Sequence, residues 1–177
     1  MNTIECITSR RSIRSFKKQT IEKEVMDQVV AAAAYAPSWK NTQITRYIFV
    51  ESEEGKRKLL ETVPSYNKKA IEEAAVVVIV TVIAKRSGFE RDGSYSTVKG
   101  DSWQMFDAGV ASQTLCLAAH EYGLGTVIQG IFDYDKVRED FQIPEEKEVV
   151  ALIPMGYPSE NPDAPKRKMI GELYTIC

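Results

Sequence analysis

The chain has 177 residues, of which 44% are hydrophobic and 27% are charged, and its formal net charge at pH 7 is -2. This length fits one domain, residues 1–177, built around a single core. The composition excludes a disordered chain, and the slightly acidic balance excludes a general nucleic-acid-binding surface.

The cysteines argue against two further classes of protein. Cys6, Cys116 and Cys177 are odd in number and far apart, so neither a disulfide framework nor a cysteine-based zinc site is expected. The longest apolar run, 74–84, is shorter than the roughly 20 residues that span a bilayer, and residues 1–5 contain no apolar segment of a signal peptide. We therefore expect a soluble cytoplasmic protein with neither a membrane nor a nucleic acid as partner.

The first third of the chain is predicted to be mainly helical. Thr3 and Thr20 are candidate N-caps because each precedes a helical pattern and acidic residues that suit the first turn. Pro37 ends the second pattern. The elements expected here are a helix from 3 to about 10, a helix from 21 to about 35, a polar loop over 37–43 and a strand over 46–51.

The rest of the chain alternates between helices and strands. Residues 75–83 are Ala75 followed by an unbroken β-branched run without alternation, which predicts a central strand covered on both faces. The polar segment 85–102 is long for a structureless loop, so we expect a functional flap or a local helix there. The other expected elements are helices over 52–62, 67–73, 103–122 and 134–141, and strands over 125–128 and 149–155. The order predicts a sheet with mixed strand directions and helices on both sides.

Several motifs are excluded by their context. Gly123-Leu124-Gly125 follows a helix and leads into a strand, which is the reverse of a dinucleotide-binding turn. Gly125 to Gly130 has the glycine spacing of a P-loop, but Ile131 stands where the lysine is required. These glycines are interpreted as a helix stop and a close approach of two backbones.

No metal site is expected either. His120 is the only histidine, which excludes sites with several histidines and makes a catalytic triad depend on a residue deep in a helix. The remaining candidate ligands lack the spacing of a calcium loop and are interpreted as solvated carboxylates: Asp92, Asp101 and Asp107.

Residues 10–16, the arginine segment, carry three arginines and two serines in a mildly acidic chain. Guanidinium groups bind phosphate oxygens in pairs and stay charged at any physiological pH, so the segment indicates an anion site. The alternative is a set of solvated surface arginines. A second basic cluster at 166–168, the donor-rich loop at 37–43 and the pair Gln129-Gly130 accompany it.

Together these features resemble, in order, the FMN-dependent nitroreductase family over nearly the full length. The motifs are Arg10-Arg11-Ser12-Ile13-Arg14-Ser15-Phe16, Ala36-Pro37-Ser38 with Asn41 and Gln43, Gly123-Leu124-Gly125-Thr126, Met155-Gly156-Tyr157-Pro158, and Pro165-Lys166-Arg167-Lys168. The resemblance implies an α+β fold, a three-layer α/β/α sandwich with a mixed, mainly antiparallel sheet, and a homodimer with FMN at the subunit interface. It implies NADH or NADPH as electron donor and a small acceptor such as a nitroaromatic or quinone.

The resemblance also implies positions for the cofactor. Arg10, Ser12 and Arg14, with Arg11 sharing in this, would hold the phosphate, the ribityl chain or the pyrimidine edge, and Lys166 and Lys168 would close on the phosphate. Gln129 and Gly130 would direct backbone N–H groups at the ring near N5. The residues expected to reach the flavin bound mainly by the other subunit are Pro37, Ser38, Trp39 and Asn41.

Two positions depart from the family pattern. Gln129 stands where the family often has Glu, which a backbone donor should tolerate. Lys69 stands where a lysine often reaches the flavin, although its surroundings, with Asn67, differ from the commoner pattern. No catalytic side chain is expected, because the flavin carries out the hydride transfer in a ping-pong cycle.

The alternatives are a flavin enzyme of the same fold with another acceptor, such as a dehalogenase or a flavin-degrading enzyme, and a non-enzymatic nucleotide-binding module. The sequence specifies neither the acceptor nor the preferred nicotinamide nucleotide.

Overall fold

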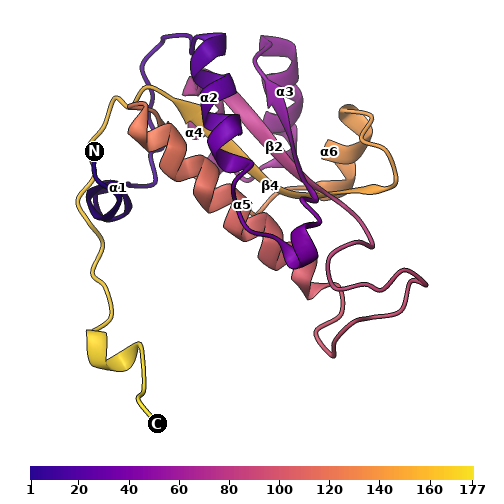
Figure 1. The fold of residues 1–177 in the computed structure, drawn as a ribbon. Helices are drawn as coiled ribbons and strands as arrows, with labels where there is room; N and C mark the ends of the chain where they lie inside the picture. Colours follow the sequence, from indigo (N-terminus) through magenta and orange to yellow (C-terminus); the bar gives the residue numbers. More distant parts are fainter.

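The computed structural model describes residues 1–177 and shows a sheet between two layers of helices (Figure 1). The helices are α1 (Thr3–Ser9), α2 (Lys23–Ala33), α3 (Glu53–Thr62), α4 (Ser65–Glu73), α5 (Ser102–Glu121) and α6 (Tyr134–Asp140), with short 3-10 turns η1 (Trp39–Asn41) and η2 (Ile170–Glu172). The strands are β1 (Thr45–Val50), β2 (Val76–Ile83), β3 (Gly125–Thr126) and β4 (Lys147–Gly156). The predicted alternation of helices and strands is confirmed.

The sheet has the order β1-β2-β4-β3, and all neighbouring strands are antiparallel. The prediction of mixed strand directions was therefore wrong for these four strands; the one parallel pairing is the isolated bridge between Ser12 and Thr126. For β1 and β2 the reason is that two helices in series, α3 and α4, connect the strands. The second helix returns the chain to the end of the sheet where β1 finished, so β2 runs back.

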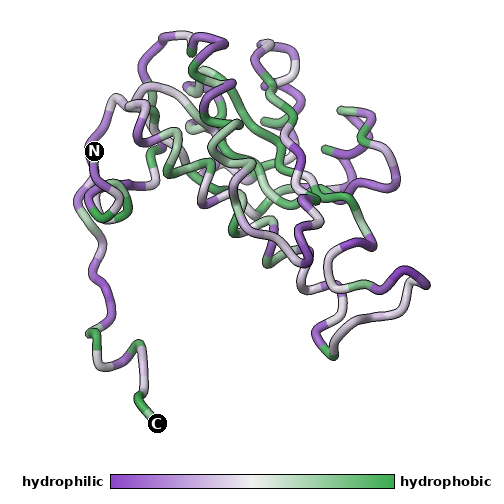
Figure 2. Tube along the Cα trace, viewed as in Figure 1, coloured by the Kyte–Doolittle hydropathy of each residue, from purple (hydrophilic) through white to green (hydrophobic).

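Strand β2 is the centre of the core, as its β-branched run predicts. Every residue from Val76 to Val82 is buried, and successive side chains point to opposite faces. Val77 and Ile79 belong to the cluster under α3, α4 and α6, whereas Val78 and Val80 belong to the cluster under α2 and α5. Figure 2 shows the hydrophobic colour concentrated in this middle layer. The three-layer arrangement therefore follows from one strand that is apolar on both faces.

Both predicted helix starts need correction. The side chain of Asn2, not Thr3, caps α1 by accepting from the backbone N–H of Glu5 at 2.9 Å. Helix α2 begins at Lys23 without a side-chain cap, because Ile21 is buried in the cluster that Met26 also contacts. A hydrophobic residue before the N-cap that packs on the first turn is a hydrophobic staple, which sets a helix start without Thr20.

The local helix that was one alternative for the segment after β2 is absent, because residues 84–101 contain neither a helix nor a strand; the alternative of a flap is left. Strand β3 stops at Thr126 instead of reaching 128. Gly123 has φ 76°, the left-handed conformation expected after the end of α5. The last residues leave the body of the protein (Figure 1), and from 163 to 177 all are exposed. None of the helices combines the length and the apolar character that crossing a membrane requires.

Candidate functional site

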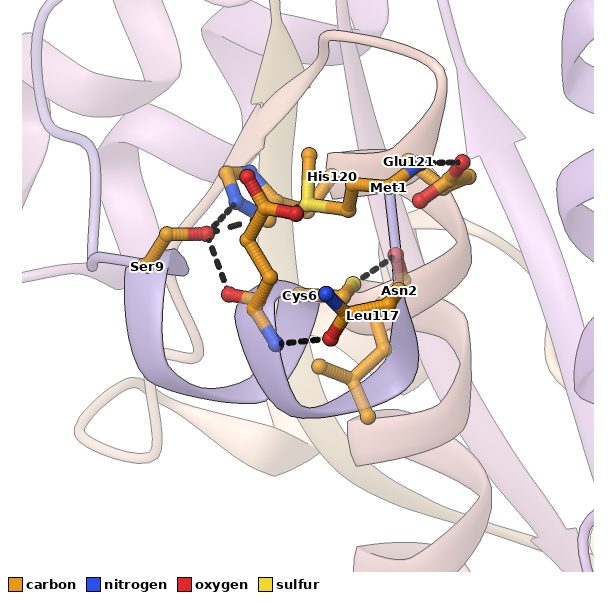
Figure 3. A network of polar contacts seen from close by, with 8 residues as sticks. Met1, Asn2, Cys6, Ser9, Leu117, His120 and Glu121 are labelled. Atoms are coloured by element: carbon orange, nitrogen blue, oxygen red, sulfur yellow. Dashed lines mark hydrogen bonds and ion pairs between the residues drawn. The ribbon is translucent and has the colours of Figure 1, made fainter.

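Helix α1 fixes the start of the arginine segment against the far end of α5. The hydroxyl of Ser9 lies 2.8 Å from Nε2 of His120, and Sγ of Cys6 donates to the carbonyl of Leu117 at 3.5 Å (Figure 3). The N-terminal amine also pairs with Glu121 at 2.6 Å. Arg10 is the C-cap of α1, so these contacts determine where it lies.

The arginine segment then continues in extended form along strand β3. The backbone N–H of Ile13 donates to the carbonyl of Thr126 at 3.0 Å, and the Ile13 side chain is buried. A Cβ on Gly125 would lie 2.7 Å from Cγ1 of Ile13, so the crossing requires glycine. Because side chains alternate along an extended chain, Ile13 faces the core while Ser12 and Arg14 face outward.

A cavity of about 360 Å³ lies beside this segment and has no hydrophobic side chain in its wall. Its lining consists of Arg10, Arg11, Ser12, Arg14, Pro162, Asp163, Pro165 and Arg167. We call it the basic cavity. Arg167 is the only cation of the C-terminal tail in this lining, which includes neither Lys166 nor Lys168. Lys168 instead lies 3.4 Å from Glu172 in an exposed ion pair.

The arginine side chains of the basic cavity form no ion pairs, although Glu160 lies nearby and accepts the backbone N–H of Arg14. Arg10, Arg11 and Arg14 take part in no ion pair, and Nε of Arg10 is buried without a hydrogen-bond partner. Burial and the positive charge of Arg10 lower the pKa of His120 below its usual value. An orphaned guanidinium N–H beside three further arginines suits a bound anion with several oxygen atoms, as a phosphate monoester has.

Helix α4 connects the arginine segment to the turn at Gln129-Gly130. At one end of α4, Glu73 accepts from the backbone N–H of Phe16 at 3.0 Å. Near the other end, the carbonyl of Asn67 accepts from Nε2 of Gln129 at 3.2 Å. Gln129 is 4% exposed, whereas Lys69 is exposed and lies 3.8 Å from Glu73. Helix α4 therefore contacts the end of the arginine segment through Glu73 and the side chain of Gln129 through Asn67.

The turn itself is open at Gly130. A Cβ built there would meet no atom within 4 Å, although Tyr134 donates to the Gly130 carbonyl at 2.7 Å. Space next to a glycine backbone lets a planar ligand approach closely. The predicted role of the turn in facing a flavin ring remains a prediction.

The loop at 38–43 lies elsewhere, at the first turns of α5. The backbone N–H of Trp39 donates to both carboxylate oxygens of Asp107, at 3.1 and 3.0 Å. Asp107 is 3% exposed, so its interpretation as a solvated carboxylate was wrong. Pro37, Ser38 and Asn41 come with this loop, so the structure separates them from the arginines.

The loop and the arginine segment are separated by most of the length of α5. The loop contacts the helix at Asp107, while Ser9, directly before the arginine segment, contacts it at His120. At 1.5 Å per residue these contacts are about 20 Å apart. The two groups of predicted residues cannot touch the same part of one small ligand within a single chain.

Sequence reasoning missed two residues of this region. Arg167 stands between two lysines, and only the path of the tail shows which of the three side chains faces the arginines. Asp107 carries a signal in the sequence, because Trp103 and Ala111, four residues before and after it on the same face of the helical pattern, are apolar.

The comparisons agree on one family. The model described as "Nitroreductase family" matches residues 7–64 and 60–157. A Methanothermobacter thermautotrophicus protein, provisionally named NADH dehydrogenase/NAD(P)H nitroreductase, is 32% identical over 168 residues, which cover 92% of this chain and 80% of the relative. The FMN reductase (NADPH) of Bacillus subtilis is 30% identical over 184 residues, covering 97% and 73%. A crystal structure of a nitroreductase family protein from Clostridium difficile 630 superposes with a TM-score of 0.81 at 27% identity, covering 99% and 98%.

Proposed function

The chain belongs to the nitroreductase family, and from this premise we propose that it is an FMN-dependent NAD(P)H oxidoreductase. Its acceptor would be a small molecule such as a nitroaromatic or a quinone. Bound FMN would supply two-electron chemistry, in which a hydride is taken from NAD(P)H and later passed to the acceptor.

The observation that carries the proposal is the basic cavity with its unpaired arginines. A phosphate monoester brings nearly two negative charges, and Arg10, Arg14 and Arg167 can neutralise them with paired N–H donors. Ser12 adds a neutral donor at the same wall. Asp163 is the one carboxylate in the lining, so the net charge of the wall favours an anion.

The remaining contacts of this chain would orient the ring. Gln129 and Gly130 stand at the open turn, and the hydrogen bond of Gln129 to the Asn67 carbonyl holds that turn against α4. Lys69, on the same helix, is exposed and can reach outward. Cationic and N–H groups near the ring stabilise the negative charge that develops on reduction.

We also propose a homodimer, in which the loop at 37–41 of one chain meets the FMN held by the arginines of the other. Three observations support it. The two residue groups lie at opposite ends of α5; Met105 and Phe106 on that helix are 40% and 61% exposed; and the tail exposes Met169, Ile170, Leu173 and Tyr174. A second copy would cover these apolar side chains.

The proposed function can be tested by reducing and reoxidising the protein under anaerobic conditions. The purified protein should be yellow with about one FMN per chain, and NADH or NADPH should bleach it without added acceptor. Mixing the reduced protein with nitroaromatics, quinones and free flavins should restore the colour at rates that rank the acceptors. Protein that stays colourless after incubation with FMN would refute the proposal and favour a nucleotide-binding module.

The test of the dimer uses complementation. Arg10→Ala impairs the phosphate half of the site, and Asn41→Ala impairs the half offered by the other chain. If each site uses both chains, mixing the two variants should regenerate one intact site per mixed dimer and recover part of the lost activity. No recovery after confirmed subunit exchange would mean that each site lies within one chain.

A further inference from the structure

The loop at 38–43 has an unusual backbone for its composition. Lys40, Asn41 and Gln43 have φ values of 44°, 55° and 48°, so three residues other than glycine lie in the left-handed region. Such conformations are strained, and they persist only where the surroundings determine them. The loop therefore needs an anchor outside itself.

Hydrogen bonds within the loop close it but do not attach it to the protein. The backbone N–H of Asn41 donates to the Ser38 carbonyl at 3.0 Å, and that of Thr42 donates to the Trp39 carbonyl at 2.8 Å. The hydroxyl of Ser38 accepts from the N–H of Gln43 at 2.9 Å. All of these partners would move together if the loop left the body.

The attachment is the carboxylate of Asp107 on α5. It accepts the backbone N–H of Trp39 with both oxygens, and Oδ2 also accepts from the hydroxyl of Ser87 at 2.6 Å. Ser87 is 0% exposed, and its Oγ lies 2.7 Å from Oγ1 of Thr42. Because the single hydroxyl hydrogen of Ser87 is given to the carboxylate, Thr42 must donate to Ser87. Every group around Asp107 is thus a donor.

The segment 84–101, which supplies Ser87, holds the loop from a second side. Lys40 forms an ion pair at 3.0 Å with Glu90 of this segment. Trp39 packs on Trp103 of α5 with ring centroids 4.7 Å apart. The contacts therefore come from two elements that are remote from the loop in sequence.

We propose that Asp107 is the positioning residue of the 38–43 loop, and that Ser87 extends this anchor to the 84–101 segment. The carboxylate holds the loop in its left-handed conformation and fixes where Ser38 and Asn41 are presented. The consequence for the cofactor rests on the proposed function, because the loop then meets the FMN of the other chain. Asp107 acts through the loop and touches no reacting atom.

Replacing Asp107 by Asn tests the anchor with little change in shape. An amide offers one acceptor oxygen, and its NH₂ group would face the N–H of Trp39 or the hydroxyl of Ser87, which are both donors. The matched control is Asp101→Asn, which makes the same charge change one turn and a half earlier. Asp101 is exposed and makes no side-chain cap of α5.

The position of the loop can be read directly, because the protein has only two tryptophans and they are Trp39 and Trp103. Rings in contact give a coupled signal in circular dichroism, which Trp103→Phe identifies by removing it. We expect Asp107→Asn and Ser87→Ala to weaken this signal, and Asp101→Asn to leave it unchanged. Ser87→Ala keeps the Asp107 carboxylate, so it tests the anchor even if Asp107→Asn does not fold.

FMN affinity provides the second readout. Asp107→Asn should raise the FMN dissociation constant about tenfold or more, the effect expected when a hydrogen bond to a charged group is lost. Asp101→Asn should change it less than about twofold. An unchanged tryptophan signal in Asp107→Asn and Ser87→Ala would overturn the proposal. A weakened signal in a protein that never binds FMN would uphold the anchor and refute the proposed function instead.

Discussion

Replacing Arg167 by alanine tests which cation of the C-terminal tail binds the cofactor phosphate. Arg167 is the tail cation in the wall of the basic cavity, so its loss removes one charge-assisted contact to phosphate. Such a contact is worth about 1.5–3 kcal/mol, which raises the dissociation constant roughly 10- to 150-fold.

Lys168→Ala is the matched control from the same tail. Its ammonium already pairs with Glu172 at 3.4 Å, with the two side chains 73% and 51% exposed. An exposed pair contributes at most about 1 kcal/mol, and this one does not face the cavity. We expect the FMN dissociation constant of Lys168→Ala to stay within about threefold of the wild-type value.

The assay is the change in FMN fluorescence on titration with protein freed of FMN, at low and high salt. Salt screens exposed charges, so the difference between unchanged protein and Arg167→Ala should shrink as the ionic strength rises. A tenfold loss in Lys168→Ala with normal binding in Arg167→Ala would refute this reasoning. That result would restore the assignment made from the sequence, in which the lysines close on the phosphate.

Three further predictions concern the sheet edge, the open turn and the pH dependence. Gly125→Ala should lower the free energy of unfolding, measured in urea, by about 1–3 kcal/mol, because the new methyl group overlaps the buried Ile13. An unchanged free energy of unfolding would mean that the arginine segment is free to shift. Gly130→Ala should change that free energy by less than about 0.5 kcal/mol, since its Cβ meets no atom, yet weaken FMN binding measured by the same titration. Burial and the positive charge of Arg10 lower the pKa of His120 in the folded protein. Below about pH 6.5 the unfolded chain therefore binds a proton that the folded chain binds less readily, so the free energy of unfolding should fall as the pH falls. His120→Gln should flatten this pH dependence, measured by melting curves at several pH values.

Much of the fold follows from local sequence patterns. The β-branched run at 76–82 favours a strand covered on both faces, and Gly123 favours the end of a helix, because branched side chains fit an extended backbone and glycine readily adopts positive φ. The predicted helices ending near 10 and starting at 21 leave the arginine segment on the connection between them, where the structure places it. Its support on β3 was not foreseen, because the contact of Ile13 with Gly125 joins positions more than 100 residues apart.

The failures have a common physical cause. Thr20 is a good cap by composition, but the burial of Ile21 decides where α2 begins. Helical spacing can place Asp107 on an apolar face, but only the arrival of Trp39 and Ser87 from distant segments gives its carboxylate partners. Which groups cap a helix or accept a hydrogen bond depends on residues that are distant in the sequence but close in the fold. The positions of those residues cannot be read from a single sequence.

Helix α5 links these observations into one account of the site. It carries the anchor of the 38–43 loop near its start and the support of the arginine segment near its end, so its length fixes the distance between the two half-sites. In the proposed dimer each FMN needs the end of one α5 and the start of the other. Because both chains then contribute to each site, FMN binding and dimer formation stabilise each other. The strain in the loop is offset in such a dimer, since a rigid half-site loses less conformational entropy when the two chains associate.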